Sequence, residues 1–446
     1  MLITHANLIT WEQPNRIFQD YALRIENGLI VELGPSVELR TVYPNEEVCD
    51  AHGQYVLPGN ICAHTHFYGA FARGMPIPGD APAEFTQILQ KLWWPLDQSL
   101  TLEDVRFSAL VCLIDAIKHG TTTLFDHHAS PKAIEGSLDS IAQTVDQAGL
   151  RAVLCYEVTD RNGADGARRG IEENARFLKQ AGTYPLIVGC FGLHAALTIS
   201  NQTLKACRDA VPEDTGFHIH LSESRDDMHS VGERGNGWPV DWLNNFDILG
   251  PRTITAHAVY VDDYEIGQLA ETGTWVTHQP RSNMNNGVGV APVEKMLADG
   301  VRVCLGNDGF SNAMWEEWKA AYLLHKLYHE DPRRMSGNTV VQIAVHNNAA
   351  LAGTYFPQAP IGVIRPGAVA DLIFVDYHPF TTLTADNLPW HILFGGLESM
   401  VTTTIVAGKM LMRDRKLLTL DEIAIAAQAK ELSAQVWQRY RKIVGV

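Results

Sequence analysis

The sequence predicts an α/β protein, a (β/α)8 TIM-like barrel with a small discontinuous β-sandwich domain built from both termini. Two observations predict this fold. From residue 55 onward, apolar runs that end in polar clusters alternate with helix-like segments, and eight such runs occur. Before and after this region, short strand-like pieces are separated by turn residues. Eight βα units in succession are typical of a closed parallel barrel.

The eight apolar runs end in polar residues, as barrel strands do at their carboxyl ends. They close at residues 63–66, 123–128, 152–157, 187–194, 216–223, 253–257, 275–278 and 301–308. Helix-like segments lie between them, for example at residues 102–119, 136–148, 168–181 and 315–329. Because the active site of such a barrel is built at the C-terminal ends of its strands, we expect these polar clusters to meet at one mouth.

The length of 446 residues exceeds what one small core supports and fits a large barrel with a satellite domain. We expect residues 59–361 to form the barrel. Residues 1–58 and 362–415 both show short strands bounded by turns, so we expect them to form the β-sandwich together. Residues 416–446 read as a C-terminal helix.

Composition narrows the classes of partner. The net charge of −16 argues against nucleic acid, whose phosphates require a basic face. No apolar run is long enough for a transmembrane helix, and the N-terminus lacks a charged-then-apolar signal, so we expect no membrane partner. The seven cysteines show no CxxC spacing, which favours the reducing cytoplasm. We expect a homo-oligomer that binds a small-molecule substrate.

Two histidines separated by one residue, His64 and His66, close the first apolar run. On a strand, residues i and i+2 point to the same side, so both imidazoles can reach one metal ion. His220 and His218 share the face of a later strand, and His220 is the better ligand because it lies nearer the carboxyl end. Together with Asp308 after the last strand, three imidazoles and a carboxylate describe an open catalytic site for one divalent ion, zinc first and iron second.

Two further polar residues follow later strands. Glu223 stands three residues after His220, where a proton shuttle could reach both water and substrate. His257 ends the next strand and could hydrogen-bond the water or polarise the carbon under attack. Taken singly, Glu223 could be a solvated loop acid, His257 a satisfied core histidine and Asp308 a helix cap. Their joint position at strand ends favours a catalytic site.

Several stretches of the chain resemble a known superfamily. Residues 58–66, 218–223, 256–258 and 306–309 resemble the amidohydrolase superfamily, and within it the cytosine/guanine/triazine aminohydrolase branch. A closer resemblance is to SsnA-like aminohydrolases, carried by residues 66–69, 92–97, 126–131, 159–162 and 281–286. The resemblance covers nearly the whole chain, the split β-sandwich included.

The resemblance implies a single metal ion held by His64, His66, His220 and Asp308. It implies that Glu223 acts as acid and base, with His257 and the metal-binding Asp308 as the other catalytic residues. His194 matches the strand-four histidine that touches substrate in this branch. Binuclear relatives usually carry a carboxylated lysine on that strand, and its absence here favours one metal.

The substrate contacts are less sharply defined. We assign them to His194, Asp97, Arg161 and His128. Two residues depart from the pattern: Asn307 replaces a usual threonine, and Asp97 stands where many nucleoside-type relatives have glutamate, which weakens the case for ribose binding. For His127, His128 and Arg161 an equally good alternative is that they do not touch substrate, but lie behind the pocket wall and hold other side chains in place. The role of His278 stays open.

The expected function is that of a metal-dependent aminohydrolase. It would hydrolyse a C–NH2 group of a small nitrogen heterocycle, such as a purine, pterin or pyrimidine, to a carbonyl and ammonia. The first alternative is another hydrolysis at the same site, such as the opening of a cyclic amide or the removal of a halide or alkylamine, because loops decide the leaving group. The second is a non-catalytic barrel scaffold, against which the intact metal ligands and Glu223 argue.

Overall fold

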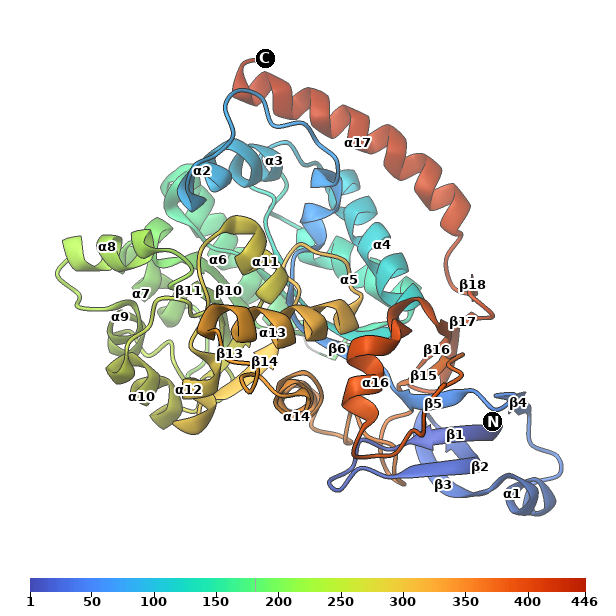
Figure 1. Cartoon of the computed structure of the whole chain (residues 1–446). Helices are drawn as coiled ribbons and strands as arrows, with labels where there is room; N and C mark the ends of the chain where they lie inside the picture. The colour runs from blue at the N-terminus through green and yellow to red at the C-terminus, as the bar shows by residue number, and fades with distance from the viewer. Residues whose placement is uncertain (181) are drawn as a thin grey trace.

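The computed structural model of the chain describes residues 1–180 and 182–446 (Figure 1). Its centre is a ring of parallel strands that pair in chain order, as a four-stranded sheet, β6 to β9, and a five-stranded sheet, β10 to β14. Isolated parallel bridges from Thr65 to Asp308 and from Val158 to Leu193 link the two sheets. The strands are β6 (Asn60–Thr65), β7 (Thr121–His128), β8 (Arg151–Tyr156), β9 (Ile187–Gly189), β10 (Phe191–Ala195), β11 (Phe217–Leu221), β12 (Ile254–His257), β13 (Trp275–His278) and β14 (Arg302–Leu305).

The predicted barrel is confirmed, strand by strand. Within the described residues β9 and β10 are two parts of one barrel strand interrupted at Cys190, so the ring has the eight positions that the sequence predicts. Every residue of β7, β8 and β11 is buried. The strands of a parallel barrel are buried on both faces, because helices cover the outer face and packed side chains fill the interior. This explains why apolar and polar residues do not alternate along these runs.

Helices surround the ring (Figure 1). Reciprocal capping boxes begin two of them, Thr101 with Asp104 at α4 and Asp262 with Glu265 at α10. The barrel helices are α4 (Leu102–Lys118), α5 (Ser137–Ala148), α6 (Gly163–Lys179), α7 (Asn201–Asp209), α8 (Arg225–Glu233), α9 (Pro239–Asn245), α10 (Asp263–Glu271), α11 (Pro280–Asn286), α12 (Val293–Ala298), α13 (Met314–His329), α14 (Gly337–Val341) and α15 (Asn348–Tyr355). Short 3-10 or π segments are η1 (Phe67–Ala72), η2 (Leu89–Trp93), η3 (Asp160–Asn162), η4 (Ala196–Thr198) and η5 (Gln342–Asn347).

One helix differs from its predicted bounds. The prediction of residues 168–181 corresponds to α6, which begins five residues earlier at Gly163. Its first turn contains Gly163 and Gly166, and glycine is a poor helix former, which hid this turn from the sequence pattern. Residue 181, the end of the predicted helix, lies outside the described residues.

Strands from both ends of the chain form one sheet, in the order β18-β17-β16-β15-β5-β1-β2-β3, with β4 paired to β1. The junction is β5, which pairs parallel with β1 and antiparallel with β15. These strands are β1 (Leu2–Ile9), β2 (Ile17–Glu26), β3 (Leu29–Pro35), β4 (Val48–Asp50), β5 (Tyr55–Pro58), β15 (Leu372–Val375), β16 (Val401–Val406), β17 (Lys409–Arg413) and β18 (Lys416–Leu417). A separate apolar cluster joins Ile3 and Leu23 to Phe374 and Ile405.

The discontinuous β-domain is therefore present, whereas the exact boundaries 1–58, 362–415 and 416–446 stay predictions. Helices α1 (Ser36–Val42), α16 (Leu388–Gly395) and η6 (Leu397–Ser399) interrupt the terminal segments. The C-terminal helix is shorter than predicted, because residues 416–417 form β18 and α17 runs from Glu422 to Val444. Asp421 caps its start by accepting from the backbone N–H of Ala424.

Helix α17 packs beside α4 and α3 (Trp94–Asp97) at the top of the barrel in Figure 1. Trp437 Nε1 donates to the backbone carbonyl of Phe71 at 2.8 Å, and Arg439 Nε donates to that of Ser99 at 2.6 Å. This helix therefore braces the segment between β6 and α4, which also contains α2 (Phe85–Ile88). Among the described residues, no helix combines the length and apolarity needed to cross a membrane.

Candidate active site

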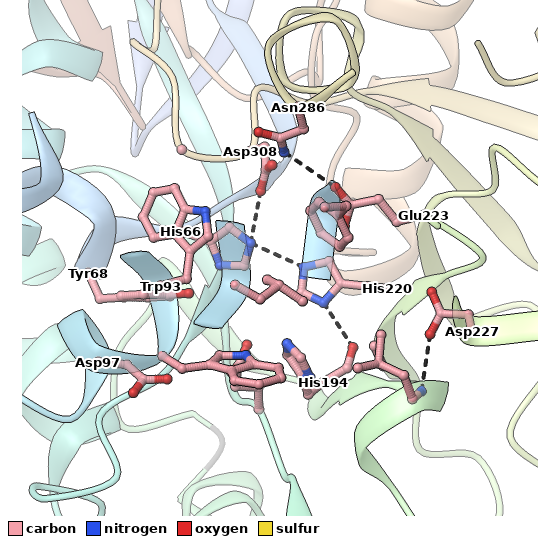
Figure 2. A pocket seen from close by; sticks show the side chains of 17 residues that line it. His66, Tyr68, Trp93, Asp97, His194, His220, Glu223, Asp227, Asn286 and Asp308 are labelled. Carbon is pink, nitrogen blue, oxygen red and sulfur yellow. Dashed lines mark hydrogen bonds and ion pairs between the residues drawn. The ribbon is translucent and has the colours of Figure 1, made fainter. Parts of the chain in front are cut away.

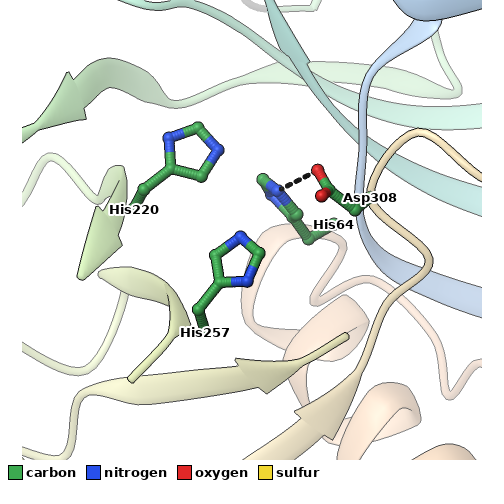
Figure 3. A group of neighbouring side chains, drawn as sticks. All are labelled: His64, His220, His257 and Asp308. Atoms are coloured by element: carbon green, nitrogen blue, oxygen red, sulfur yellow. Dashed lines mark ion pairs between the residues drawn. The ribbon is translucent and has the colours of Figure 1, made fainter. Parts of the chain in front are cut away.

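Strand-end side chains converge at the centre of the barrel mouth. One ligand atom from each of His64, His220, His257 and Asp308 lies within 4.8 Å of the others (Figure 3). His66 Nε2 joins this group, 2.9 Å from Asp308 Oδ1 and 3.2 Å from His220 Nε2. The structure thus brings together the four residues predicted as metal ligands and places His257 beside them.

The donor set fits a divalent cation. His64 Nε2 and His257 Nε2 are buried and have no hydrogen-bond partner among the described residues. A buried nitrogen without a partner costs about 1–3 kcal/mol, so such atoms need an explanation. A cation in this cluster would supply the missing partner, and imidazole nitrogens with one carboxylate oxygen are ligands that zinc prefers.

Two other groups of three side chains contain His220 and could also hold a metal ion. One is His220 with His66 and His127, and the other is His220 with Glu157 and His194. His127 Nε2 already contacts two backbone carbonyl oxygens at 3.0 and 3.2 Å, and Glu157 accepts a hydrogen bond from an arginine. Their ligand atoms are therefore engaged in protein contacts, which favours the cluster that contains Asp308.

The backbone fixes Asp308 beside the first strand. Its N–H donates to the carbonyl of His64 at 3.1 Å, and its own carbonyl accepts from the N–H of His66 at 3.0 Å. Asp308 has φ of 58°, a left-handed conformation that aspartate tolerates better than most residues. Ser282 donates to its Oδ2, which leaves Oδ1 directed at the histidines.

The charges of the cluster follow from its burial. Burial would raise the pKa of Asp308, but the adjacent His64 and His66 imidazoles hold it well below its usual range. Burial lowers the pKa of His66, yet the Asp308 carboxylate outweighs it and raises the pKa to about 9. Burial lowers the pKa of His64 to about 3. The carboxylate is therefore ionised and His64 is neutral, as metal ligands must be, whereas His66 has to release a proton when a metal binds.

Glu223 follows β11 and is buried beside the cluster. Burial, reinforced by the negative charge of Asp308, raises the pKa of Glu223 well above its usual value. Its Oε1 lies 3.5 Å from Nδ2 of Asn286, and its Oε2 lies 3.5 Å from His257 Nε2. A carboxyl group whose pKa is raised from its usual value is suited to general acid and base work.

His257 presents one nitrogen to the cluster and anchors the other. Its Nδ1 lies 2.9 Å from Oδ1 of Asn283, an oxygen that can only accept, so Nδ1 carries the proton. Nε2 is then the unprotonated nitrogen and faces Glu223. Burial lowers the pKa of His257, which keeps the ring neutral.

A cavity of about 610 Å³, its open mouth included, adjoins the cluster (Figure 2). Tyr68, Phe85, Leu89, Trp93 and Trp94 line one side of it. All belong to the segment between β6 and α4 that α17 braces. Flat aromatic side chains suit the faces of a small heterocyclic ring.

Two of the four predicted substrate contacts line this cavity. They are His194 at the end of β10 and Asp97 at the end of α3. His194 Nδ1 lies 2.6 Å from Thr198 Oγ1, which orients the ring. Burial raises the pKa of Asp97 to about 7, although the charge of Arg161 opposes this.

The other two predicted contacts lie behind the cavity wall. Arg161 donates to Asp97 Oδ2 and to Glu157 Oε1, both at 3.0 Å, and its guanidinium lies 5.0 Å from the ring centre of Trp94. His128 is fully buried, 2.8 Å from Ser130 Oγ. For both residues the structure favours the alternative of a supporting role behind the wall.

Glu157 lines the cavity and was not assigned a role from the sequence. It follows β8, and its Oε2 lies 3.3 Å from His127 Nδ1. Burial would raise the pKa of Glu157, but its interactions with His194, His127 and Arg161 lower it to about 2. The signal was available, because Glu157 ends one of the eight apolar runs in the same manner as Glu223 and Asp308. Tyr68, Asp227 and Asn286 also line the cavity and carried no comparable signal.

Comparison with known proteins places this arrangement in a family. The Amidohydrolase family matches residues 55–411, which span the barrel and part of the terminal sheet. The chain belongs to the amidohydrolase family. As an amidohydrolase it is a hydrolase that acts on carbon–nitrogen bonds.

Similar curated proteins cover almost the same length. The 5'-deoxyadenosine deaminase of Methanosarcina mazei is 31% identical over 446 residues, which are 98% of this chain and 99% of that protein. The 5-methylthioadenosine/S-adenosylhomocysteine deaminase of Haloarcula marismortui is 34% identical over 403 residues, 88% of this chain and 89% of that protein.

Solved structures share the fold. An adenosine deaminase from Xanthomonas campestris with bound zinc superposes with a TM-score of 0.85 at 23% identity, covering 98% of each chain. The guanine deaminase of E. coli gives a TM-score of 0.80 at 19% identity, covering 92% of this chain and 99% of that one. At these identities the likeness shows the fold alone.

Proposed function

We propose that this amidohydrolase is a zinc-dependent deaminase that converts a C–NH2 group of a small, uncharged nitrogen heterocycle to a carbonyl and releases ammonia. The observation that carries the proposal is the position of Glu223, buried with a raised pKa, 3.5 Å from His257 and beside the histidine and aspartate cluster. The deaminase names of the curated relatives support it.

One zinc ion would be held by His64, His66, His220 and Asp308, and such an ion lowers the pKa of a bound water to about 7. Glu223 takes the first proton of the water and passes it to a ring nitrogen of the substrate. It then takes the proton of the new hydroxyl group and gives it to the leaving amine, so that a carbonyl and ammonia result. His257 accepts a hydrogen bond from the attacking water at Nε2, the nitrogen that Asn283 leaves unprotonated. His194 lines the same pocket, away from Asp308 in Figure 2, and would contact the heterocycle there.

The charge of the wall narrows the substrate class. Arg161 is flanked by Asp97 and Glu157, so its charge is already paired with carboxylates. Asp97 Oδ1 has no hydrogen-bond partner among the described residues, whereas Glu157 Oε2 lies 3.3 Å from His127 Nδ1. Asp97 could therefore accept from a hydroxyl or N–H group of a substrate, and the two carboxylates together disfavour an anion.

This preference fits a nucleoside better than the sequence suggested. A ribose-type diol donates hydrogen bonds that Asp97 can accept, and a shorter carboxylate does not remove that capacity. The substrate class we propose is an adenosine-type nucleoside without a negatively charged substituent. A cytoplasmic location and a homo-oligomeric state remain predictions of the sequence.

The test is ammonia release from a panel of amino-heterocycles by the zinc-loaded protein. We expect turnover of 5'-deoxyadenosine and 5'-methylthioadenosine, and weaker turnover of S-adenosylhomocysteine, which carries a carboxylate. Matched cyclic amides and halogenated triazines serve as the alternative substrates. If the protein turned over only the cyclic amides or halogenated triazines and released no ammonia from any amino-heterocycle, its reaction would be amide opening or halide removal and not deamination.

A further inference from the structure

The three histidines predicted to bind metal are held in two different ways. The Nδ1 atoms of His66 and His220 each lie close to a backbone carbonyl oxygen, at 2.6 and 2.8 Å. His64 Nδ1 lies instead 2.8 Å from Nε2 of another imidazole, His218. A carbonyl oxygen is always an acceptor, whereas an imidazole nitrogen accepts only in one of its two neutral tautomers.

The surroundings of His218 determine its role in this pair. His218 and His64 are both fully buried, so water does not replace either partner. His218 lies on β11 two residues before His220, on the same face but deeper in the barrel. Its Nδ1 has no hydrogen-bond partner among the described residues, and one of its ring nitrogens lies within 4.8 Å of the sulfurs of Cys155 and Cys190.

These contacts are consistent with one arrangement of protons. If His64 Nδ1 donates to His218 Nε2, then His64 Nε2 has its lone pair free and directed toward Asp308, 3.4 Å away. If His218 donated instead, His64 would carry its proton on Nε2 and could not bind a cation there. The metal-binding form of His64 therefore requires His218 to act as the acceptor.

We propose that His218 is a positioning residue that fixes the tautomer and ring orientation of His64 and so raises the affinity of the site for zinc. The inference rests on the metal site of the proposed function. Partners of this kind typically change metal affinity by about 10- to 100-fold. Neither neighbouring strand offers His64 Nδ1 another hydrogen-bond partner among the described residues.

The test compares three variants by zinc affinity, measured by competition with a chromophoric chelator. His218→Leu removes the acceptor at similar volume, whereas His218→Gln can place an amide oxygen near the position of Nε2. His325→Leu is the matched control, because His325 is also buried and its Nε2 lies 3.2 Å from that of His278, away from the metal cluster. The thermal midpoint of each metal-free protein reports any general loss of packing.

We expect His218→Leu to weaken zinc binding by about 10- to 100-fold, His218→Gln to restore most of that loss, and His325→Leu to bind zinc as the unaltered chain does. Unchanged affinity in His218→Leu would overturn the proposal. Equal losses in the Leu and Gln variants would also overturn it, because packing and not hydrogen bonding would then be the cause. If His218→Leu does not fold, His218→Met takes its place. If the unaltered chain bound no zinc, the proposed metal site itself would fail.

Discussion

Glu223 Oε2 lies 3.5 Å from His257 Nε2, and both side chains are buried at the edge of the metal-binding cluster. The imidazole nitrogen has no hydrogen-bond partner among the described residues, and the carboxyl has a raised pKa. A water molecule in contact with both groups could donate a hydrogen bond to the imidazole and give its other proton to the carboxylate.

The change Glu223→Gln keeps the shape of the side chain and removes its capacity to take a proton. We expect turnover to fall by about 100- to 10,000-fold, the usual contribution of a general acid–base group. Zinc content should stay unchanged, because Glu223 is not among the proposed ligands. Elemental analysis and ammonia assays of the same preparation measure both quantities. Loss of zinc would make Glu223 a ligand, and near-normal turnover would remove it from the reaction.

Removal of zinc with a chelator should abolish ammonia release, and one equivalent per chain should restore it. Since the metal binds only the folded chain, the thermal midpoint should rise with zinc concentration. Titration of the metal-free protein, followed by activity and by calorimetry, gives the stoichiometry. A requirement for two equivalents would contradict the mononuclear site.

Asp97 should make recognition of hydroxylated substrates depend on pH. Burial raises its pKa to about 7, so the group is largely neutral below that value and ionised above it. The ionised form accepts a hydrogen bond more strongly. The Michaelis constant for a nucleoside should therefore fall as the pH rises from about 6 to about 8. In Asp97→Asn the Michaelis constant should not change over this pH range. If it fell with pH as it does in the unaltered protein, Asp97 would not be the group responsible.

His119 offers a test of stability away from the site. Its Nδ1 lies 3.1 Å from Oδ1 of Asp115, and this hydrogen bond raises the pKa of His119 above 6.5. A raised pKa in the folded state means that the contribution is complete below about pH 6.5 and disappears as the pH rises through the higher folded value. Urea unfolding should therefore show a deficit for His119→Gln at about pH 6 that shrinks by about pH 9. A deficit that grows with pH would have the wrong sign.

The sequence was a good guide to the barrel and to its strand ends. Each of the eight apolar runs became a strand position, because strands covered on both sides must be apolar and polar residues can begin only where the mouth opens. Glu223, His257 and Asp308 follow such runs, so their convergence could be predicted before any contact was known.

Contacts between distant segments could not be predicted in this way. Arg161 and Asp97 are 64 residues apart, and nothing local indicates that their charges pair. The difference between His218 and His220 is one of depth in the barrel, and a period of two places both on one face. The depth argument placed His220 nearer the mouth than His218, and His220 does line the cavity, but the argument gave His218 no role.

The most direct test of the central claim is the mass of the product formed in oxygen-18-labelled water by the zinc-loaded protein acting on 5'-deoxyadenosine. The proposed reaction predicts that the amine is replaced by one oxygen atom that carries the label, with one ammonia released per molecule of product. An unchanged substrate mass, while a cyclic amide opens or a halide leaves at the same site, would contradict it.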